Sequence, residues 1–436
     1  MTRTAFGPSA VAGQAGPGQQ VRGGALVLVG LGVLGLANYV FLTVTARAVR
    51  PAEYAALAAL YLLMSILGPG VFSALEQETS RLVSTRLAHG LGVRTVVRQA
   101  TLTTALLVVP LLVAMVLFAG PLTRSVLGGD RRLLAALMLS VVGFAGVYLT
   151  RGLFSGQRHF GRYAINVGAE GLVRLVFCVL LPLLAVASPA PYAFALCAAP
   201  AAAMLLTAAW FRPGTPGPAE PWAALAQATA WLLAAQLLSQ AMANIGPVLV
   251  KASLADAHRA GVFAAAFVLA RVPLFVFVSA QTILLPTLAR ASARRDIAGL
   301  RKGVRQALGV VAALGVVGVS VAAVVGDELV RLIFGPDFVV SWTIMPLLTA
   351  GTVLSMAVLV LQPGLLSVGR HHVVALAWIA GMAVFFAVFL LPADPVAEAV
   401  AAQIIGPAVT AGIMAVVLIY ALRRAGSVPI RREEHM

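Results

Sequence analysis

Charged side chains are scarce in this chain, and acidic ones are the scarcest. Asp, Glu, Lys and Arg make up 11% of the 436 residues, and only 15 residues are Asp or Glu. A soluble domain usually carries roughly 25% charged residues, so this sequence cannot cover a large water-facing surface. The composition excludes a soluble enzyme and leaves little of the chain for a soluble domain of any kind.

Residues that build common catalytic and metal centres are also few. The two cysteines, Cys178 and Cys197, lie within apolar stretches and have no pairing pattern. They therefore predict neither a disulfide framework nor a metal site. No phosphate-binding loop, nucleophile elbow or zinc-protease motif occurs in the sequence. We predict that the protein is not an enzyme and needs no metal or other cofactor.

Hydrophobic residues, by contrast, make up 61% of the chain. They gather in apolar stretches of the length that a helix needs to cross a bilayer, about 20 residues. The sequence therefore predicts an all-α membrane protein of about twelve transmembrane helices. Prolines such as Pro69 and Pro273 predict bends where freed backbone groups line a cavity. The predicted spans are 24–46, 54–75, 99–119, 132–150, 164–187, 190–210, 222–249, 260–284, 304–325, 342–362, 373–391 and 396–422.

A run rich in Pro and Gly after the sixth span divides the chain into two halves. The pattern G-L-[FL]-S-x-x-R-H follows the fourth span at Gly152 and the tenth at Gly364. Ala-Asn recurs at Asn38 and Asn244. These repeats are either chance in an Ala- and Leu-rich chain or the trace of two pseudo-symmetric lobes with the same orientation. We predict a disordered cytoplasmic tail (1–23), an N-terminal six-helix lobe (24–211), a cytoplasmic linker (212–221), a C-terminal six-helix lobe (222–422) and a cytoplasmic tail (423–436).

The net charge of +16 comes from arginines placed between the apolar stretches. Nucleic-acid binding would need a solvated basic face with base-reading residues, and no segment has one. Most of the 31 Lys and Arg residues fall in the loops on the side of the predicted tails. Because cytoplasmic loops carry the excess of positive charge, both termini are predicted to be cytoplasmic.

Three charged residues lie well inside predicted spans, where an ionised group is costly and usually faces a wet interior. Glu170 and Arg174 stand four residues apart in the favourable order for a helical ion pair. They form either a self-neutralising pair or part of a hydrophilic cavity wall. Arg271 has no acid one turn away, so it needs a partner from another helix, water or an anionic ligand. If the partner is structural, Glu170 or another acid is expected to pair with it. The planar guanidinium of Arg271 suits a phosphate group.

Amide side chains also lie in or beside the spans. Asn38, Asn244 and Gln281 complete the predicted substrate path with the three charged residues. Hydrogen bonding between helices is the default role of each amide. Several amides together can instead line a path for sugar hydroxyls. The others are Asn166, Gln236, Gln240, Gln362 and Gln403.

The segment 45–54, T-A-R-A-V-R-P-A-E-Y, resembles the polysaccharide-biosynthesis flippases of the multidrug/oligosaccharidyl-lipid/polysaccharide (MOP) superfamily. These are O-antigen and exopolysaccharide transporters, and they usually have Gly where this chain has Ala55. The segment 334–338, F-G-P-D-F, is similar to the family as well. The resemblance covers the chain from about 24 to 422 and rests on the order of loose motifs. Arg47, in the first motif, joins the predicted substrate path.

The resemblance implies a two-lobed transporter with a MATE-like fold. Such a protein moves a polyprenyl-diphosphate-linked oligosaccharide from the cytoplasmic to the outer leaflet of the bacterial cytoplasmic membrane, by alternating access, for cell-surface polysaccharide biosynthesis. The expected partners are this lipid-linked substrate, membrane lipids, and glycosyltransferases or a polysaccharide polymerase. Relatives flip the lipid-linked peptidoglycan precursor or export cationic drugs.

The deep charges favour an anionic cargo. No Asp lies in the middle of a span, and the clearest mid-span carboxylate, Glu170, already has Arg174 one turn away. A cation exporter needs free carboxylates there. We therefore predict a flippase for lipid-linked oligosaccharide. The alternatives are a drug/cation antiporter, a flippase for the lipid-linked peptidoglycan precursor, and a membrane scaffold for a polysaccharide synthase.

Overall fold

The computed structural model describes residues 17–211, 214–219, 221–274, 277, 296–368 and 370–426. Over these ranges the regular structure is helical and no strand occurs. Twelve of the helices are long and apolar enough to cross a membrane. The predicted all-α fold with twelve spans is confirmed.

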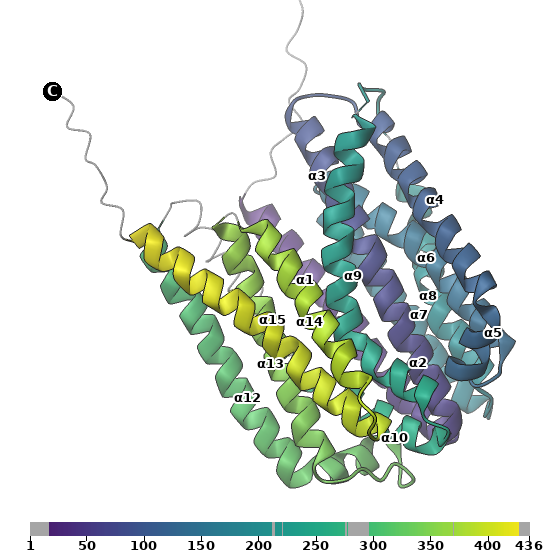
Figure 1. The fold of residues 1–436 in the computed structure, drawn as a ribbon. Coiled ribbons are helices and arrows are strands. Elements are labelled where there is room, and N and C mark those ends of the chain that lie inside the picture. The colour runs from purple at the N-terminus through teal and green to yellow at the C-terminus, as the bar shows by residue number, and fades with distance from the viewer. Residues whose placement is uncertain are drawn as a thin grey trace, which may run out of the picture.

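Most of the described helices follow one another through short connections (Figure 1). The second span consists of three consecutive pieces, namely α2 (Pro51–Leu67), the π-helical turn η1 (Gly68–Phe72) and α3 (Ser73–Ala88). The other elements are α1 (Pro17–Ala48), α4 (Arg94–Leu117), α5 (Ala119–Pro121), η2 (Leu122–Val126), α6 (Arg131–Gly156), α7 (Phe160–Leu183), α8 (Pro189–Thr207), η3 (Ala208–Trp210), α9 (Trp222–Ser253), α10 (Ala257–Leu269), α12 (Ile297–Phe334), α13 (Ile344–Ser367), α14 (His371–Phe389) and α15 (Pro395–Gly426).

Local sequence explains where several of these helices begin. Asp130, Asp256 and Asp296 precede α6, α10 and α12, and each carboxylate accepts a backbone N–H of the first turn. These N–H groups have no partner within the helix, so the cap stabilises the helix start. Pro51 and Pro189 open α2 and α8, where the missing N–H of proline costs nothing.

Following the division predicted from the sequence, we call α1 to α8 the N-terminal lobe and α9 to α15 the C-terminal lobe. In the N-terminal lobe α1 packs on α7, and α6 packs on α3 and α8. In the C-terminal lobe α13 packs on α12 and α15, and α15 packs on α14. The lobes meet where α2 packs against α9 and α10 and where α1 contacts α12. In Figure 1 the helices converge around α10, whereas towards the end where the chain termini leave α12 and α15 lean away from α3 and α4 and α9 stays beside α3.

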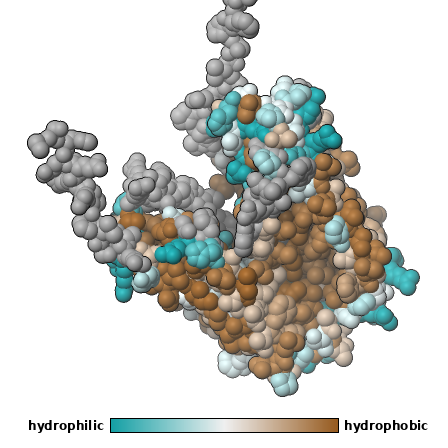
Figure 2. All heavy atoms as spheres, turned by 45° about the horizontal axis from the view of Figure 1, so that its top comes forward, coloured by the Kyte–Doolittle hydropathy of each residue, from teal (hydrophilic) through white to brown (hydrophobic). Residues whose placement is uncertain are grey.

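Apolar side chains cover the flanks of the molecule. Leu106, Leu117, Leu183 and Val324 are 73%, 74%, 76% and 79% exposed. Figure 2 shows hydrophobic residues over the sides and hydrophilic residues gathered towards the ends. A soluble protein rarely exposes so wide an apolar surface. The flanks therefore face the hydrocarbon core of a membrane.

Several helices run past their predicted boundaries. α1 begins at Pro17 rather than at 24, and α15 ends at Gly426 rather than at 422, so the parts of the predicted tails next to the lobes are helical. The second span continues to Ala88 rather than to 75. Hydropathy marks only the part of a helix that crosses the hydrocarbon core, and a helix continues into the polar region until a breaking residue occurs.

The predicted linker is fastened to the N-terminal lobe over its described residues, 214–219. The backbone N–H of Arg94, at the start of α4, donates to the carbonyl of Thr215 at 2.9 Å. The Thr95 hydroxyl donates to the carbonyl of Gly217 at 2.5 Å. The lack of a side chain at Gly92 lets the backbone of Pro216 approach closely. This part of the linker thus lies against the turn between α3 and α4.

Candidate functional site

The N-terminal lobe contains a buried ion network around Glu170. This side chain is 2% exposed, and both of its carboxylate oxygens are occupied. Arg151, near the end of α6, donates Nη2–H to one oxygen at 2.7 Å. Arg174, one turn along α7, donates to the other oxygen. Glu170 therefore has no free oxygen with which to bind a cation.

Amide and hydroxyl groups extend this network across four helices. Arg174 donates to Oδ1 of Asn38 on α1. Arg151 Nε donates to Oδ1 of Asn166 on α7 at 2.8 Å, and the Asn166 amide donates to the Thr207 hydroxyl on α8 at 2.8 Å. Nε of Arg174 is the one buried nitrogen of these arginines without a partner. Buried charges that are paired and hydrogen-bonded in this way hold α1, α6, α7 and α8 in register.

A second deep arginine, Arg271, lies at a break in the eighth span. α10 ends at Leu269, and the backbone turns at Arg271 before helical geometry resumes at Val272. Pro273 has no N–H to donate, and the N–H of Leu274 bonds to the carbonyl of Arg271 at 3.0 Å. Non-helical backbone at membrane depth is tolerated where it is buried in protein or lines a cavity.

The Arg271 guanidinium makes no ion pair with a carboxylate among the described residues. Its Nη1–H donates to Oδ1 of Asn244 at 2.7 Å, and its Nη2–H donates to the carbonyl of Ala243. The guanidinium carbon lies 4.7 Å from the centre of the Phe267 ring. Dipoles and a π face stabilise this charge, but no described anion neutralises it.

Arg271 also lies at the boundary between the lobes. Tyr39 on α1 and Tyr61 on α2 are close enough to interact with its charge. The Tyr39 hydroxyl donates to the carbonyl of Val268, in the last turn of α10, at 3.3 Å. Side chains of both lobes therefore surround the break in the eighth span.

A polar stripe on α9 runs beside this break. Gln236, Gln240 and Asn244 follow at four-residue spacing, so they share one helix face. The Asn244 amide donates to the carbonyl of Gln240 at 2.8 Å. Gln236 donates to the Ser73 hydroxyl, at the start of α3, at 3.0 Å. The stripe thus connects Arg271 to the second span of the other lobe.

The second span is interrupted next to the same stripe. At η1, which contains Pro69, the helix widens to a π turn, and Gly70 packs against Leu237 and Gln240 of α9. Pro69 in the second span and Pro273 in the eighth occupy corresponding places in the two lobes. A pair of interrupted helices in corresponding positions is the strongest sequence pointer to a transporter binding site.

A cavity of about 320 Å³ opens along this stripe into the C-terminal lobe. Small-molecule sites usually occupy about 300–1,000 Å³. Arg271 is the only charged residue among the described residues that line it. The lining residues are Gln236, Ser239, Gln240, Met242, Ala243, Arg271, Leu274, Thr352, Ser355, Val358, Leu359, Trp378, Gln403 and Pro407.

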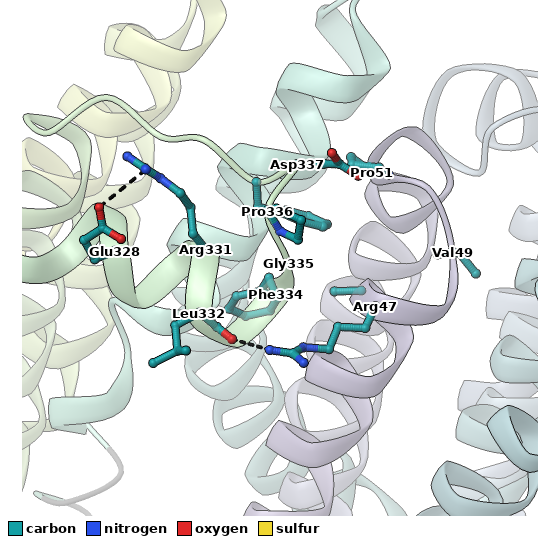
Figure 3. A pocket seen from close by; sticks show the side chains of 12 residues that line it. Arg47, Val49, Pro51, Glu328, Arg331, Leu332, Phe334, Gly335, Pro336 and Asp337 are labelled. Carbon is teal, nitrogen blue, oxygen red and sulfur yellow. Dashed lines mark hydrogen bonds and ion pairs between the residues drawn. The ribbon is translucent and has the colours of Figure 1, made fainter.

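Arg47 lies elsewhere, at the α10 end of the molecule, beside a cavity of about 640 Å³ between α1 and the end of α12 (Figure 3). Its Nε–H donates to the carbonyl of Ile333 at 3.0 Å, and its Nη2–H donates to the carbonyl of Leu332. Arg331 points the opposite way in Figure 3, towards Glu328. Arg47 therefore caps the C-terminal end of α12 across the lobe boundary, where positive charge is favourable.

Aromatic rings close the same end of the lobe boundary. Tyr54 on α2 lies 6.0 Å from Phe334 and 5.5 Å from Phe338, measured between ring centres. All three rings are at most 2% exposed. A side chain at Gly261 on α10 would overlap the carbonyl of Pro51, so α2 and α10 touch backbone to backbone. Direct contacts between the lobes thus seal the α10 end.

The predicted path residues therefore fall into three places. Asn38 accepts from Arg174 in the N-terminal lobe, Asn244 accepts from Arg271 at the lobe boundary, and Arg47 lies at the α10 end. Gln281 lies outside the described residues. Arg151, Trp378, Thr352 and Ser355 were missed, because nothing in a single sequence marks which span ends or hydroxyls face inward.

Solved structures with this fold are membrane transporters. An inward-facing conformation of a multidrug resistance MATE family transporter of the MOP superfamily matches with a TM-score of 0.68 and 14% identity, covering 92% of this chain and 98% of that one. An outward-facing conformation of such a transporter matches with a TM-score of 0.62 and 16% identity, and the match covers 94% of this chain and 96% of that one. A MOP superfamily transporter from Pyrococcus furiosus, described as having a binding pocket of reverse polarity, matches with a TM-score of 0.62 and 15% identity, and the match covers 94% of this chain and 96% of that one. The chain has the MATE fold of the MOP transporters.

The sequence narrows this class further. The model of the polysaccharide biosynthesis protein family matches residues 21–292, which is more than half of the chain. The protein belongs to this family, as the resemblance in its motifs predicted. No curated protein sequence matches the chain. Family and fold together identify a multi-pass membrane protein of the polysaccharide biosynthesis family with a MATE fold.

Proposed function

We propose that the protein flips a polyprenyl-diphosphate-linked oligosaccharide from the cytoplasmic to the outer leaflet for cell-surface polysaccharide biosynthesis. The observation that carries this proposal is Arg271, a deep guanidinium with no described carboxylate partner, at an interrupted helix beside a cavity. A guanidinium can donate two parallel hydrogen bonds to phosphate oxygens. In this proposal the diphosphate supplies the anion that Arg271 lacks.

The membrane potential supports export of such an anion. Moving one elementary charge across the membrane is worth about 2.3 kcal/mol per 100 mV. A diphosphate that leaves a negative interior gains this free energy. The direction requires both termini to be cytoplasmic, in a bacterial cytoplasmic membrane, as the arginine distribution predicts.

We assign the other predicted path residues different roles. Glu170, Arg174 and Asn38 hold the helices of the N-terminal lobe together, because their polar groups are nearly all occupied by protein partners. Arg47 acts as a latch at the α10 end, which is the outer end in the predicted orientation. Closure there, with α12 and α15 leaning away from α3 and α4 at the opposite end, supports an inward-facing state of an alternating-access cycle. Glycosyltransferases or a polysaccharide polymerase remain the expected protein partners.

Proteoliposomes provide the test. Purified protein, reconstituted in liposomes, is expected to translocate a polyprenyl-diphosphate oligosaccharide, and R271Q is expected to stop this transport. R132Q is the matched control, because Arg132 pairs with Asp130 at an exposed helix start. Equal transport by R271Q and R132Q would remove Arg271 from the path. A panel of head groups that includes the lipid-linked peptidoglycan precursor would separate the two kinds of flippase.

The MATE fold favours one second candidate, a drug/cation antiporter. Its best residue would be Glu170, the deep carboxylate, but two arginines occupy both of its oxygens. Efflux of ethidium from cells that express the protein, abolished by E170Q in a variant that remains folded, would establish this candidate in place of the flippase.

A further inference from the structure

The cavity in the C-terminal lobe has a composition that diphosphate binding alone does not explain. Arg271 is its only charged lining residue among those described, and most of its other polar groups are amides and hydroxyls. They come from four helices, namely Gln236 and Gln240 on α9, Ser355 on α13, Trp378 on α14 and Gln403 on α15. A phosphate would need neither the neutral groups nor the indole.

Gln403 provides the sharpest observation. It is 3% exposed, and its side-chain oxygen Oε1 is buried without a hydrogen-bond partner. A buried polar atom without a partner is costly and rare in native proteins. Gln403 lines the cavity, so a ligand that donates a hydrogen bond there would satisfy this atom.

The hydroxyl groups in the lining are arranged as acceptors. Thr352 and Ser355 donate to carbonyls of their own helix, at 3.1 and 3.0 Å, which leaves oxygen lone pairs to accept from a ligand. The Gln240 oxygen accepts from the Asn244 amide at 3.3 Å, while its NH₂ group remains to donate. The lining therefore offers both acceptors and a donor, as neutral hydroxyl groups require.

Trp378 adds an apolar face. The indole N–H is already bonded to Gln362 at 3.1 Å, so the ring meets the cavity through carbon atoms. A pyranose has hydroxyls around its rim and C–H groups on its faces, and it matches amides at the edge with an aromatic face. The volume of about 320 Å³ is at the small end for a ligand site and suits one sugar ring.

The geometry points to this cavity as a subsite for one neutral sugar ring, the one bonded directly to the diphosphate, with Gln403 as a principal recognition residue. This inference rests on the proposed function, because Arg271 on the same cavity places the diphosphate next to the sugar. The N-terminal lobe network binds neither group. The subsite would make the protein selective for the first sugar of the glycan.

Binding to short lipid analogues tests the subsite. The probes are citronellyl diphosphate and its conjugates with glucose, galactose or N-acetylglucosamine, measured by calorimetry on protein in nanodiscs. One hydrogen bond contributes roughly three- to tenfold in affinity. We expect at least one conjugate to bind ten or more times tighter than the bare diphosphate. Q403L should remove about three- to tenfold of that gain and leave binding of the bare diphosphate unchanged.

A thermal measurement distinguishes recognition from a structural role. Because Oε1 of Gln403 has no partner in the empty protein, Q403L should unfold at the same temperature as the wild type or higher. The control T410V removes a buried hydroxyl of the same helix that bonds only to protein atoms and does not line the cavity. T410V should lower the melting temperature and keep the full gain from the sugar. A lower melting temperature for Q403L, or loss of the gain in T410V, would overturn the assignment.

The remaining outcomes separate this inference from the proposed function. If bare citronellyl diphosphate binds in an Arg271-dependent way but no sugar tightens binding, the subsite is wrong and the diphosphate site stands. If farnesyl diphosphate binds tighter than citronellyl diphosphate and sugars add nothing, the cavity takes the lipid chain. If none of the diphosphates binds, the proposed function fails and the subsite fails with it.

Discussion

The deeply placed arginines of the two lobes have different kinds of partners. In the N-terminal lobe Arg174 lies against Glu170 and Asn38, and Arg151 shares the same carboxylate. In the C-terminal lobe Arg271 has an amide, a backbone carbonyl and an aromatic face, but no described carboxylate. Arg174 and Arg271 both lie within helices that are long and apolar enough to span a membrane, so the difference between them lies in their partners. A buried charge that its own lobe neutralises holds helices together, whereas one left without a counter-ion remains available to a ligand.

The asparagines make the comparison sharper. Asn38 and Asn244 belong to the first and seventh spans, the corresponding helices of the two lobes, and each accepts a hydrogen bond from a deep arginine. The arginines themselves come from different spans, the fifth for Arg174 and the eighth for Arg271. The repeated position is therefore the acceptor, and each lobe supplies its cation from elsewhere.

The largest expected effect comes from removing the shared carboxylate. E170L leaves two buried arginines without a counter-charge, and breaking a buried pair in this way costs about 3–5 kcal/mol. The free energy of unfolding, measured in mixed micelles with increasing SDS, should fall by this amount. E53Q, at an exposed ion pair, is the control and should change little. If E170L kept its stability and lost only transport, the Glu170 network would have a role in transport rather than a structural role, and the proposed difference between the lobes would be wrong.

The second-largest effect concerns Arg271, where we expect a loss of ligand binding instead of a loss of stability. R271Q removes a deep charge that has no described counter-ion, so the free energy of unfolding should stay the same or rise. Loss of charge-assisted hydrogen bonds to a diphosphate, about 1.5–3 kcal/mol, should weaken binding of citronellyl diphosphate roughly ten- to hundredfold. Titration calorimetry measures the binding, and SDS unfolding measures the stability. A strong loss of stability in R271Q would show that a protein anion pairs with this residue.

A third, smaller effect tests an arginine that is deep in neither lobe. Arg47 is exposed and caps α12 across the lobe boundary, and a cation at a helix C-terminus contributes about 0.3–1 kcal/mol. R47Q should therefore increase the population open at the α10 end by up to about fivefold. Double electron–electron resonance between spin labels at positions 124 and 339 reports this opening. An unchanged distance distribution would show that the other contacts at this end keep it closed without Arg47.

The smallest effect is expected at the exposed pair of Asp130 and Arg132. The hydrogen bond from Arg132 holds the pKa of Asp130 below its ordinary value. The ionised carboxylate is therefore favoured in the folded protein, and its contribution is complete above the unfolded pKa, about 3.9, and disappears as the pH falls through the folded pKa. D130N should cost less than about 1 kcal/mol at neutral pH, because Asn also caps helices. Thermal unfolding at pH 7 and pH 3 measures the difference, which should be smaller at the lower pH.

The sequence predicted the number of spans and the ion pair in the N-terminal lobe, but it left the partner of Arg271 open. Twelve apolar stretches of sufficient length predicted an all-α membrane protein, the family resemblance added the MATE-like fold, and spacing alone predicted the pair of Glu170 and Arg174. Arg151 was assigned to a loop, because hydropathy cannot tell whether an arginine at a span end turns outward or back into the bundle. For Arg271 the sequence left three alternatives, a partner from another helix, water or an anionic ligand. The structure supplies an amide and a backbone carbonyl from α9 but no described carboxylate, so the charge itself remains available to an anionic ligand.

By itself, the sequence determined that this chain is a membrane protein, because a surface with so few charged residues is stable against the hydrocarbon core of a bilayer and not in water. Local sequence also explains the starts of α6, α10 and α12, because an aspartate cap acts on the first turn that follows it. Only the tertiary structure decided which arginine is neutralised and which amide is left without a partner. Those properties depend on groups brought together from distant helices, and sequence spacing carries no record of them.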